Sequence, residues 1–390
     1  IAIRARAEHF KGLIVPRQNV MEAAVVNNLE VYGMDTMMDV IQLLTGMKAY
    51  EPTQIDTRKR FYESQYHFDI DFADVRGQEN VKRALEVAAA GSHNVILIGP
   101  PGSGKSMMAK RFPTIMPPLT LAESLETTQI HSIAGKLGSD TSLITQRPFR
   151  SPHHTISEVA LVGGGSNPMP GEISLAHNGV LFLDELPEFA RDTLEVLRQP
   201  LEDGKVTVSR VHGSASYPCK FMLVAAMNPC KCGYLGHPTR ECTCTPSAVD
   251  AYRRRISGPL LDRIDLHVEA LPVEYDDLAS ELGGEPSADI RARVMAARAL
   301  QQERYKALRG VRCNAQLPSS ALRRYCRMTP AAEKILRGAF ERLGYSARAY
   351  DRILRVARTV ADLDGSEVLD AAHLSEALQY RSLDRKFGMR

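Results

Sequence analysis

One stretch of the chain decides the fold, Asn94-Val-Ile-Leu-Ile-Gly-Pro-Pro-Gly-Ser-Gly-Lys-Ser106. Residues 94–98 are a short, almost wholly apolar run, which is typical of a parallel strand buried on both faces. Residues 99–106 fit the pattern G-x-x-x-x-G-K-[ST], and a helical segment follows from about Met107. Strand, glycine-rich loop and helix in this order predict a phosphate-binding loop.

The composition of this loop explains its expected chemistry. Glycines let the backbone curl so that its N–H groups point at phosphate oxygens, and the helix N-terminus adds a positive dipole. We expect Lys105 to reach the β- and γ-phosphates and the Ser106 hydroxyl to ligate Mg²⁺. The sequence therefore predicts an ATP site made by Gly99, Pro100, Pro101, Gly102, Ser103, Gly104, Lys105 and Ser106.

A second apolar run ends in two acids, Val180-Leu-Phe-Leu-Asp184-Glu185. The Asp184 carboxylate can support Mg²⁺ through its water shell, and Glu185 can orient and deprotonate the attacking water. An apolar strand that ends in acids can also be a strand that simply leaves the core. The phosphate loop about 80 residues upstream favours the hydrolytic interpretation.

A third run, residues 221–226, ends at Met227-Asn228. The Asn228 amide is expected beside the γ-phosphate, where it could hold the lytic water, although Asn at a strand end is also a common turn residue. Apolar runs that alternate with helical segments predict a layered α/β domain with a mostly parallel sheet. Loop, acids and polar strand tip in this order resemble an AAA+ ATPase core.

Three longer motifs sharpen that resemblance: Arg147-Pro-Phe-Arg-Ser-Pro-His-His154, Gly171-Glu-Ile-Ser-Leu-Ala-His-Asn-Gly179 and Ser257-Gly-Pro-Leu-Leu-Asp-Arg-Ile-Asp265. Together they resemble the ComM/YifB family of magnesium-chelatase-related AAA+ proteins, from about residue 8 to the end of the chain. The resemblance implies Walker A roles for Lys105 and Ser106, Walker B roles for Asp184 and Glu185, and the sensor-1 role for Asn228.

The resemblance also implies roles for arginines. Arg263 falls where related ATPases place the finger that reaches a neighbouring subunit's nucleotide. Arg348 falls at the sensor-2 position, and Arg352, one turn later, is the rival for that role. A finger supplied by a neighbour implies a homo-oligomer, for which the family suggests a hexameric ring. For either arginine role the alternative is an ordinary surface ion pair.

The chain divides into four expected parts. Residues 1–47 contain apolar runs and a helical pattern, and they resemble the last portion of the Lon-protease-like domain that precedes the ATPase in this family. Residues 48–70, with mixed charge, predict a linker, residues 71–270 the α/β core, and residues 271–390 a helical lid. Helical spacing in the lid covers residues 290–309, 330–343 and 347–363. The chain has no initiating Met, so we expect a fragment that begins inside a domain.

Four cysteines, Cys230, Cys232, Cys242 and Cys244, bracket a loop of nine residues. Four thiolates at this spacing can close tetrahedrally on Zn²⁺, so a structural zinc site is the favoured interpretation. His237 in place of one thiol, a redox dithiol and four unrelated cysteines are the alternatives. Because the resembled family has members without several of these cysteines, the metal is not expected to be essential to ATP hydrolysis.

Residues 204–218 alternate apolar and polar side chains around a small-residue tip, which predicts a β-hairpin. Related ring helicases point a hairpin at this place into the central pore, beside a second insert, here residues 152–172. Lys205, Arg210 and His212 could contact a DNA backbone. The alternative is a hairpin that only packs against the next subunit.

Composition argues against a disordered chain, a membrane-spanning protein and a secreted disulfide-rich protein. Hydrophobic residues make up 44% and charged residues 24%, as in average soluble proteins, and no apolar stretch is long enough for a membrane span. The net charge of +3 is uneven, because residues 291–390 hold 21 Lys and Arg against 10 Asp and Glu. This basic segment suits contact with phosphates. Seven cysteines, four of them clustered, are typical of a cytoplasmic protein rather than of a secreted disulfide framework.

Two functions remain open. The first is a motor that encircles and moves DNA; for a ComM-like protein the resemblance implies branch migration when incoming strands are integrated during natural transformation. The second is a remodelling ATPase that acts on a protein partner, as in magnesium chelatase. The specific motifs, the cysteine cluster and the basic lid favour the motor. A proteolytic machine is a weaker third option, because residues 1–47 offer no catalytic Ser–Lys pair.

Overall fold

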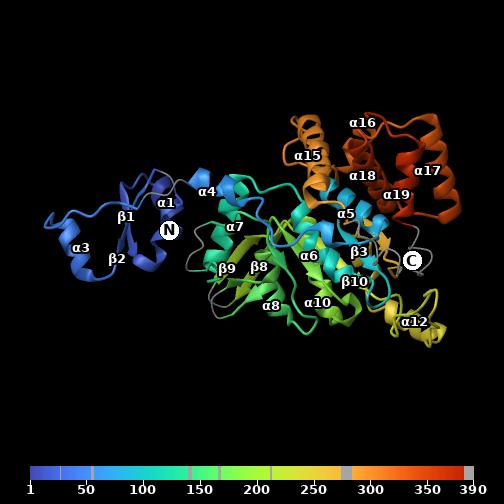
Figure 1. Ribbon diagram of the computed structural model, residues 1–390, viewed down its shortest axis with the longest axis horizontal. Coiled ribbons are helices and arrows are strands. Elements are labelled where there is room, and N and C mark those ends of the chain that lie inside the picture. Colours follow the sequence, from blue (N-terminus) through green and yellow to red (C-terminus); the bar gives the residue numbers. More distant parts are fainter. Residues whose placement is uncertain are drawn as a thin grey trace. The chain divides into compact units, whose positions relative to one another are not determined.

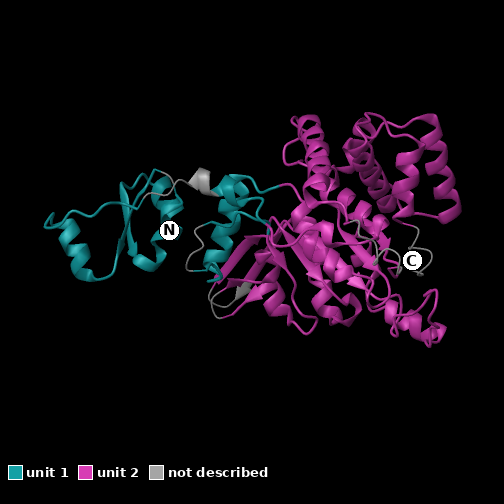
Figure 2. Cartoon of the chain, viewed as in Figure 1, with its two compact units in different colours: residues 1–67, 118–147 teal, residues 68–117, 148–390 magenta. Residues whose placement is uncertain are grey.

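In the computed structural model the chain forms two compact units (Figure 1; Figure 2). The first comprises residues 1–67 and 118–147, and the second comprises residues 68–117 and 148–390. The structure describes residues 1–26, 28–53, 57–138, 143–165, 168–210, 213–273 and 283–381. Within these ranges no helix combines the length and the apolar character that crossing a bilayer requires.

The first unit contains a pair of parallel strands, β1 (Gly12–Pro16) and β2 (Glu30–Met34). Its helices are α1 (Ala2–Ala7), η1 (Arg17–Asn19), α2 (Val20–Ala24), α3 (Met37–Leu44), α4 (Thr57–Ser64) and α7 (Leu121–Ile133). The helical pattern expected within residues 1–47 is present as α3, and a Thr36 capping box begins that helix.

The two compact units do not follow the domain boundaries that the sequence suggested at residues 47 and 70. Residues 48–70 contain helix α4, whose Phe61 is 1% exposed and packs in one apolar cluster with Leu119 and Leu143. This cluster explains why residues 118–147, which the sequence placed in the ATPase core, group with residues 1–67. A single buried aromatic in a polar stretch gives little periodicity, so the sequence alone suggested a linker.

The second unit is built around a five-stranded sheet in which every neighbouring pair is parallel. The spatial order is β11 (Leu266–Glu269), β3 (Val95–Ile98), β10 (Met222–Met227), β7 (Val180–Leu183) and β4 (Phe149–Arg150). The three apolar runs of the sequence are β3, β7 and β10, the adjacent middle strands. The mostly parallel α/β fold is thus confirmed.

Both faces of this sheet are buried. In β3, Val95 and Leu97 join one apolar cluster, and Ile96 and Ile98 join the other. The first cluster includes residues of α5 (Glu79–Gly91), α6 (Lys105–Ile115) and the C-terminal helices. The second includes residues of α8 (Glu158–Val162), α9 (Glu172–Leu175), α10 (Arg191–Glu195), α12 (Pro246–Arg253) and α13 (Gly258–Leu261). Alternation within continuous apolar strands is what burial on both faces requires.

The C-terminal helices are α15 (Ser287–Arg304), α16 (Ser319–Tyr325), α17 (Pro330–Leu343), α18 (Ala347–Leu363) and α19 (Ala371–Gln379). The bounds expected for α17 and α18 are confirmed, whereas α15 ends five residues before the expected end. Figure 1 shows α15 and α18 beside α5, and residues of all three belong to the same buried cluster. The helical part therefore forms one compact unit with the sheet.

The remaining elements are short. They are η2 (Phe72–Asp74), β5 (Gly163–Gly164), β6 (Met169–Pro170), η3 (Leu186–Glu188), α11 (Arg198–Asp203), β8 (Lys205–Arg210), β9 (Gly213–Pro218) and η4 (Asn314–Gln316). Strands β8 and β9 pair antiparallel from Lys205↔Pro218 to Arg210↔Gly213, which confirms the expected hairpin. A second small antiparallel pair, β5–β6, lies within residues 152–172.

Candidate functional site

The phosphate loop joins the carboxyl end of β3 to the first turn of α6. Gly102 and Gly104 have φ angles of +81° and +80°, a region that glycine adopts without strain. The Lys105 side chain is buried, and its Nζ donates to the carbonyl oxygens of Gly99 at 2.7 Å and Pro100 at 2.8 Å. Burial lowers the pKa of Lys105 to about 8, although the negative charge of Asp184 raises it in part. The ammonium thus lies within the loop that would surround the phosphates.

The two expected magnesium residues lie in direct contact. Ser106 Oγ donates to Asp184 Oδ2 at 2.6 Å, although 78 residues separate them in the chain. Asp184 immediately follows β7, and in a parallel sheet the carboxyl ends of β3 and β7 share one edge. A hydroxyl and a carboxylate are oxygen ligands of the kind that Mg²⁺ takes, so these two residues fit the ion.

Glu185 follows in a left-handed backbone conformation, with φ of +52°. Its side chain is 56% exposed, and its Oε2 lies 3.6 Å from Nδ1 of His154. His154 follows β4 on the same sheet edge, and its ring packs against His153 and Phe189. The expected catalytic acid therefore lies next to Asp184 at the carboxyl edge of the sheet, beside a histidine.

Asn228 follows β10, the strand between β3 and β7. Its Oδ1 lies 3.4 Å from Nζ of Lys105. The loop, both acids and the amide thus gather at one edge of the sheet, as the order of the motifs predicted.

Arg263 lies elsewhere. It precedes β11, so it belongs to the amino-end edge of the sheet, opposite the phosphate loop. Its guanidinium pairs with Glu202 and donates to the Pro259 carbonyl at 2.6 Å, and its side chain is 11% exposed. Within one chain it does not join the site.

The two sensor-2 candidates differ in their surroundings. Arg348 is exposed on the first turn of α18, whereas Arg352 NH1 lies 3.2 Å from Oδ1 of Asp265. Burial opposes ionisation of Asp265, but the His93 hydrogen bond and the charge of Arg352 outweigh it and hold the pKa at about 2. Arg352 is thus engaged in a partly buried ion pair that ties α18 to the sheet.

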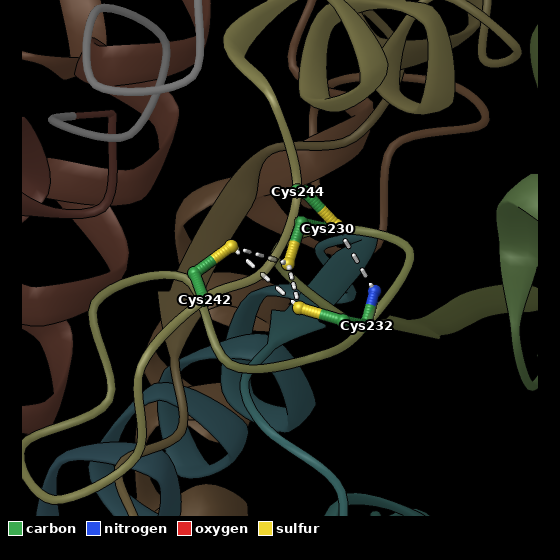
Figure 3. A group of neighbouring side chains, drawn as sticks. All are labelled: Cys230, Cys232, Cys242 and Cys244. Carbon is green, nitrogen blue, oxygen red and sulfur yellow. Dashed lines mark hydrogen bonds between the residues drawn. The ribbon is translucent and has the colours of Figure 1, made fainter.

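The four clustered cysteines converge between β10 and α12 (Figure 3). Cys230 Sγ lies 3.4 Å from Cys232 Sγ and 3.6 Å from Cys242 Sγ, and all four sulfurs lie within 4.8 Å of one another. Tetrahedral zinc with bonds of about 2.3 Å needs sulfurs roughly 3.8 Å apart, so this donor set fits Zn²⁺. A hydrogen bond from the Tyr234 backbone lowers the pKa of Cys232, whereas burial and hydrogen bonds to Cys230 and Cys232 raise the pKa of Cys242 and of Cys244.

His237 is not a member of this cluster. Its Nδ1 accepts from the backbone N–H groups of Thr239 and Arg240, both at 3.2 Å. The other cysteines, Cys219, Cys313 and Cys326, are buried and separate, as expected.

The two hairpins contact each other, because the Tyr217 hydroxyl donates to the Pro168 carbonyl at 2.6 Å. Lys205 is exposed at the start of β8. His212 lies outside the described residues, as does the side chain of Arg210. The structure therefore places one of the three proposed DNA contacts on an open surface.

Sequence reasoning missed two groups near the site. His154 stands in a quoted motif, but only the pairing of β4 with β7 brings it to Glu185. Gln78 donates from Nε2 to the carbonyl oxygens of Leu271 at 2.5 Å and Ser103 at 3.3 Å, which ties the phosphate loop to the segment after β11. Both contacts join residues far apart in the sequence.

Comparisons with known proteins agree with this architecture. The family model for magnesium chelatase subunit ChlI matches residues 71–278, and that for its C-terminal part matches residues 284–381. YifB of Escherichia coli is 44% identical over 391 residues, and the competence protein ComM of Haemophilus influenzae is 42% identical over 391 residues. Each alignment covers 98% of this chain and 74% of the relative.

A weaker similarity reaches another class. Lon protease 2 of Bacillus subtilis is 31% identical over 157 residues, which cover 37% of this chain and 27% of that protein. The ChlI model, in contrast, spans more than half of the chain, and the ComM and YifB alignments span nearly all of it. With a parallel sheet that gathers the phosphate loop, the acids and the amide at one edge, the chain belongs to the ComM/YifB family of magnesium-chelatase-related AAA+ proteins.

Proposed function

We propose that the chain hydrolyses ATP and uses the energy to move DNA through a ring of its own copies. The observation that supports hydrolysis most strongly is the 2.6 Å contact between Ser106 and Asp184, which joins the loop to the acidic strand end. The proposed ring is a homo-hexamer. Its proposed task is branch migration during natural transformation, which the 42% identity to the competence protein ComM supports.

Each residue at the sheet edge has a proposed role. Ser106 and Asp184 would hold Mg²⁺, which when bound neutralises charge on the β- and γ-phosphate oxygens. Lys105 would exchange its loop carbonyls for the same phosphates. Glu185 would take a proton from the attacking water on a carboxylate oxygen, and Asn228 would orient that water.

Two further arginines complete the proposed site. Arg263, on the opposite edge of the sheet, would exchange its pairing with Glu202 for the γ-phosphate of a neighbouring subunit. Arg348 would act as sensor 2, since it is exposed on α18 whereas Arg352 is paired with Asp265. A finger from the neighbour stabilises transition-state charge by factors of about 10³ or more in related NTPases.

The hairpins are the proposed DNA contacts. Lys205, Arg210 and His212 belong to the β8–β9 segment, and the Tyr217–Pro168 hydrogen bond links this hairpin to the insert at residues 152–172. Basic residues in a channel bind the phosphate backbone without reading its sequence. Residues 1–47 are proposed to be the end of a Lon-protease-like domain.

The test is the ATPase rate with and without single-stranded and branched DNA. We expect stimulation by DNA, salt-sensitive DNA binding, and loss of hydrolysis in the Lys105→Ala control. If DNA does not stimulate hydrolysis and no salt-sensitive DNA binding is found, the DNA-motor proposal is wrong. The alternative, a remodelling ATPase that acts on a protein partner, is then favoured.

We also propose a structural zinc ion at Cys230, Cys232, Cys242 and Cys244. Elemental analysis should find about one zinc per chain, because four converging thiolates complete a closed tetrahedral site. The content should fall sharply in Cys230→Ser. A wild-type chain purified without chelators that contains no zinc would refute this assignment.

A further inference from the structure

We propose that the cysteine loop, residues 230–244, braces the phosphate loop, so that zinc binding and nucleotide binding strengthen each other. This inference rests on the proposed zinc site and on the ATP site, and it does not involve DNA. It assigns the loop a positioning role for the nucleotide in addition to a local structural one.

The cysteine loop begins at the catalytic edge of the sheet. Cys230 is fully buried and lies two residues after Asn228, the amide at the end of β10. The carbonyl of the intervening Pro229 accepts from Arg253 Nε at 3.4 Å and NH2 at 3.3 Å. Arg253 is the last residue of α12, the helix that follows Cys244. The base of the cysteine loop is therefore anchored beside Asn228.

The turn after Cys232 touches the phosphate loop. Gly233 has φ of +87°, and its N–H donates to the Cys230 carbonyl at 3.0 Å. A methyl group built on Gly233 would lie 2.6 Å from Cδ and 2.8 Å from Cγ of Pro101, and 3.9 Å from Cγ of Asn228. Glycine is thus required here for close approach to Pro101 as well as for its backbone angle.

A metal would fix this contact. Zinc bound by Cys230 and Cys232 sets the separation of these two residues and hence the turn that presents Gly233 to Pro101. The Cys232 N–H donates to Cys244 Sγ at 3.4 Å, which is the type of second hydrogen bond that orients a metal-ligating sulfur. The phosphate loop would then be held from the side of Pro101 in the curvature that cradles phosphates.

Coupling of this kind is reciprocal. If zinc favours the phosphate loop that binds ATP, then bound nucleotide must retain zinc by the same factor. Two measurements on the 390-residue chain test the coupling from its two sides.

The first measurement compares two glycine variants. Gly233→Ala places a methyl against Pro101, whereas Gly236→Ala adds the same left-handed strain (φ +79°) with nothing within 4 Å. We expect Gly233→Ala to bind a fluorescent ATP analogue about tenfold more weakly, a size typical of coupled sites. Gly236→Ala should bind the analogue as the wild type does. Equal affinity of Gly233→Ala and Gly236→Ala would overturn the proposal, whatever their zinc content.

The second measurement follows zinc release to a coloured chelator, with and without ADP. Nucleotide should slow the release several-fold in the wild type and in Gly236→Ala, and should have no effect in Gly233→Ala. Identical release rates with and without ADP in the wild type would overturn the coupling. Neither readout depends on DNA or on turnover, so failure here would leave the motor proposal standing, and failure of the motor would leave this one standing.

Discussion

At the scale of single residues, the site depends on contacts between side chains that leave different strands at one sheet edge. Ser106 Oγ lies 2.6 Å from Asp184, and Asn228 lies 3.4 Å from Lys105. Such contacts place ligands for a phosphate, a divalent cation and a water within one small volume. Glu185 differs from these residues because its side chain is 56% exposed, so water can reach the carboxylate. His154 lies beside it, with Nδ1 3.6 Å from Oε2.

Glu185→Gln should separate binding from hydrolysis. The amide keeps the size of the side chain but cannot take the proton of the attacking water, so ATP hydrolysis should fall by about 10²–10⁴. ATP affinity, measured with a fluorescent analogue, should stay near that of the wild type. The matched control is Glu188→Gln, since Glu188 pairs with Arg255 at 2.8 Å. If both variants lose the same activity, Glu185 is not the base.

Asp265→Asn should lower stability with a defined pH dependence. The pKa of Asp265 is about 2 in the fold, against 3.8 for an ordinary aspartate, so the charged form stabilises the fold at any pH above 3.8. This contribution, about 2 kcal/mol, is lost as the pH falls from 4 to 2.

Urea denaturation should therefore show Asp265→Asn less stable than the wild type at pH 7, with the difference narrowing below pH 4. The exposed Asp69→Asn serves as control. A difference that stays constant down to pH 2 would show that the Arg352–Asp265 pair contributes no charge-dependent stability.

At the scale of elements, the two hairpins are the parts with the clearest proposed task. Lys205→Ala with Arg210→Ala should weaken DNA binding uniformly across sequences, because contacts to phosphates do not read bases. The slope of log K against log salt should decrease in magnitude by about 1.4–1.8, since each of the two lost phosphate contacts accounts for about 0.7–0.9. ATP affinity should not change.

The control is Lys306→Ala, an exposed lysine that lies two residues after the end of α15 and pairs with Glu303. A salt slope unchanged in the hairpin variant would mean that this hairpin packs against protein instead.

The sequence predicts those strands whose two faces are both buried against apolar residues. Strands β3, β7 and β10 are apolar on both faces, and they lie adjacent in the sheet, so their residues form continuous runs. Strand β4 is only two residues long and lies between Pro148 and Pro152. Strand β11 contains the buried polar His267, so neither strand gives a continuous apolar run. The phosphate loop and the acids were predictable because each is a local pattern that follows a strand.

Contacts made by the tertiary fold were not predictable. His154 near Glu185, Arg352 paired with Asp265 and Gly233 against Pro101 each join segments between 31 and 132 residues apart. No periodicity or local motif encodes these pairings. They follow from the strand order, which the sequence did not specify.

At the scale of the whole molecule, the proposed nucleotide site is completed by a second copy of the chain. The phosphate loop follows the carboxyl end of β3, and Arg263 precedes the amino end of β11, on the opposite edge of the same sheet. One chain therefore cannot bring its own Arg263 to its own nucleotide without disrupting the sheet. A neighbour in a closed ring can do so.

Arg263→Ala should bind ATP normally and hydrolyse it about 10³-fold more slowly, because the lost charge acts only on the transition state. Analytical ultracentrifugation with ATP should still show an oligomer, which separates loss of the finger from loss of assembly. Full ATPase activity of Arg263→Ala would show that Arg263 is not an arginine finger.

The most direct test of the central claim mixes two inactive variants, Lys105→Ala and Arg263→Ala. In a mixed ring an Arg263→Ala chain keeps an intact phosphate loop and can receive the finger of a Lys105→Ala neighbour. Random assembly at equal concentrations should restore ATP hydrolysis to about a quarter of the wild-type rate, the fraction of boundaries with that order. A mixture that co-assembles, as shown by capture of one tagged variant with the other, yet hydrolyses no more ATP than the separate variants would contradict a nucleotide site shared between copies.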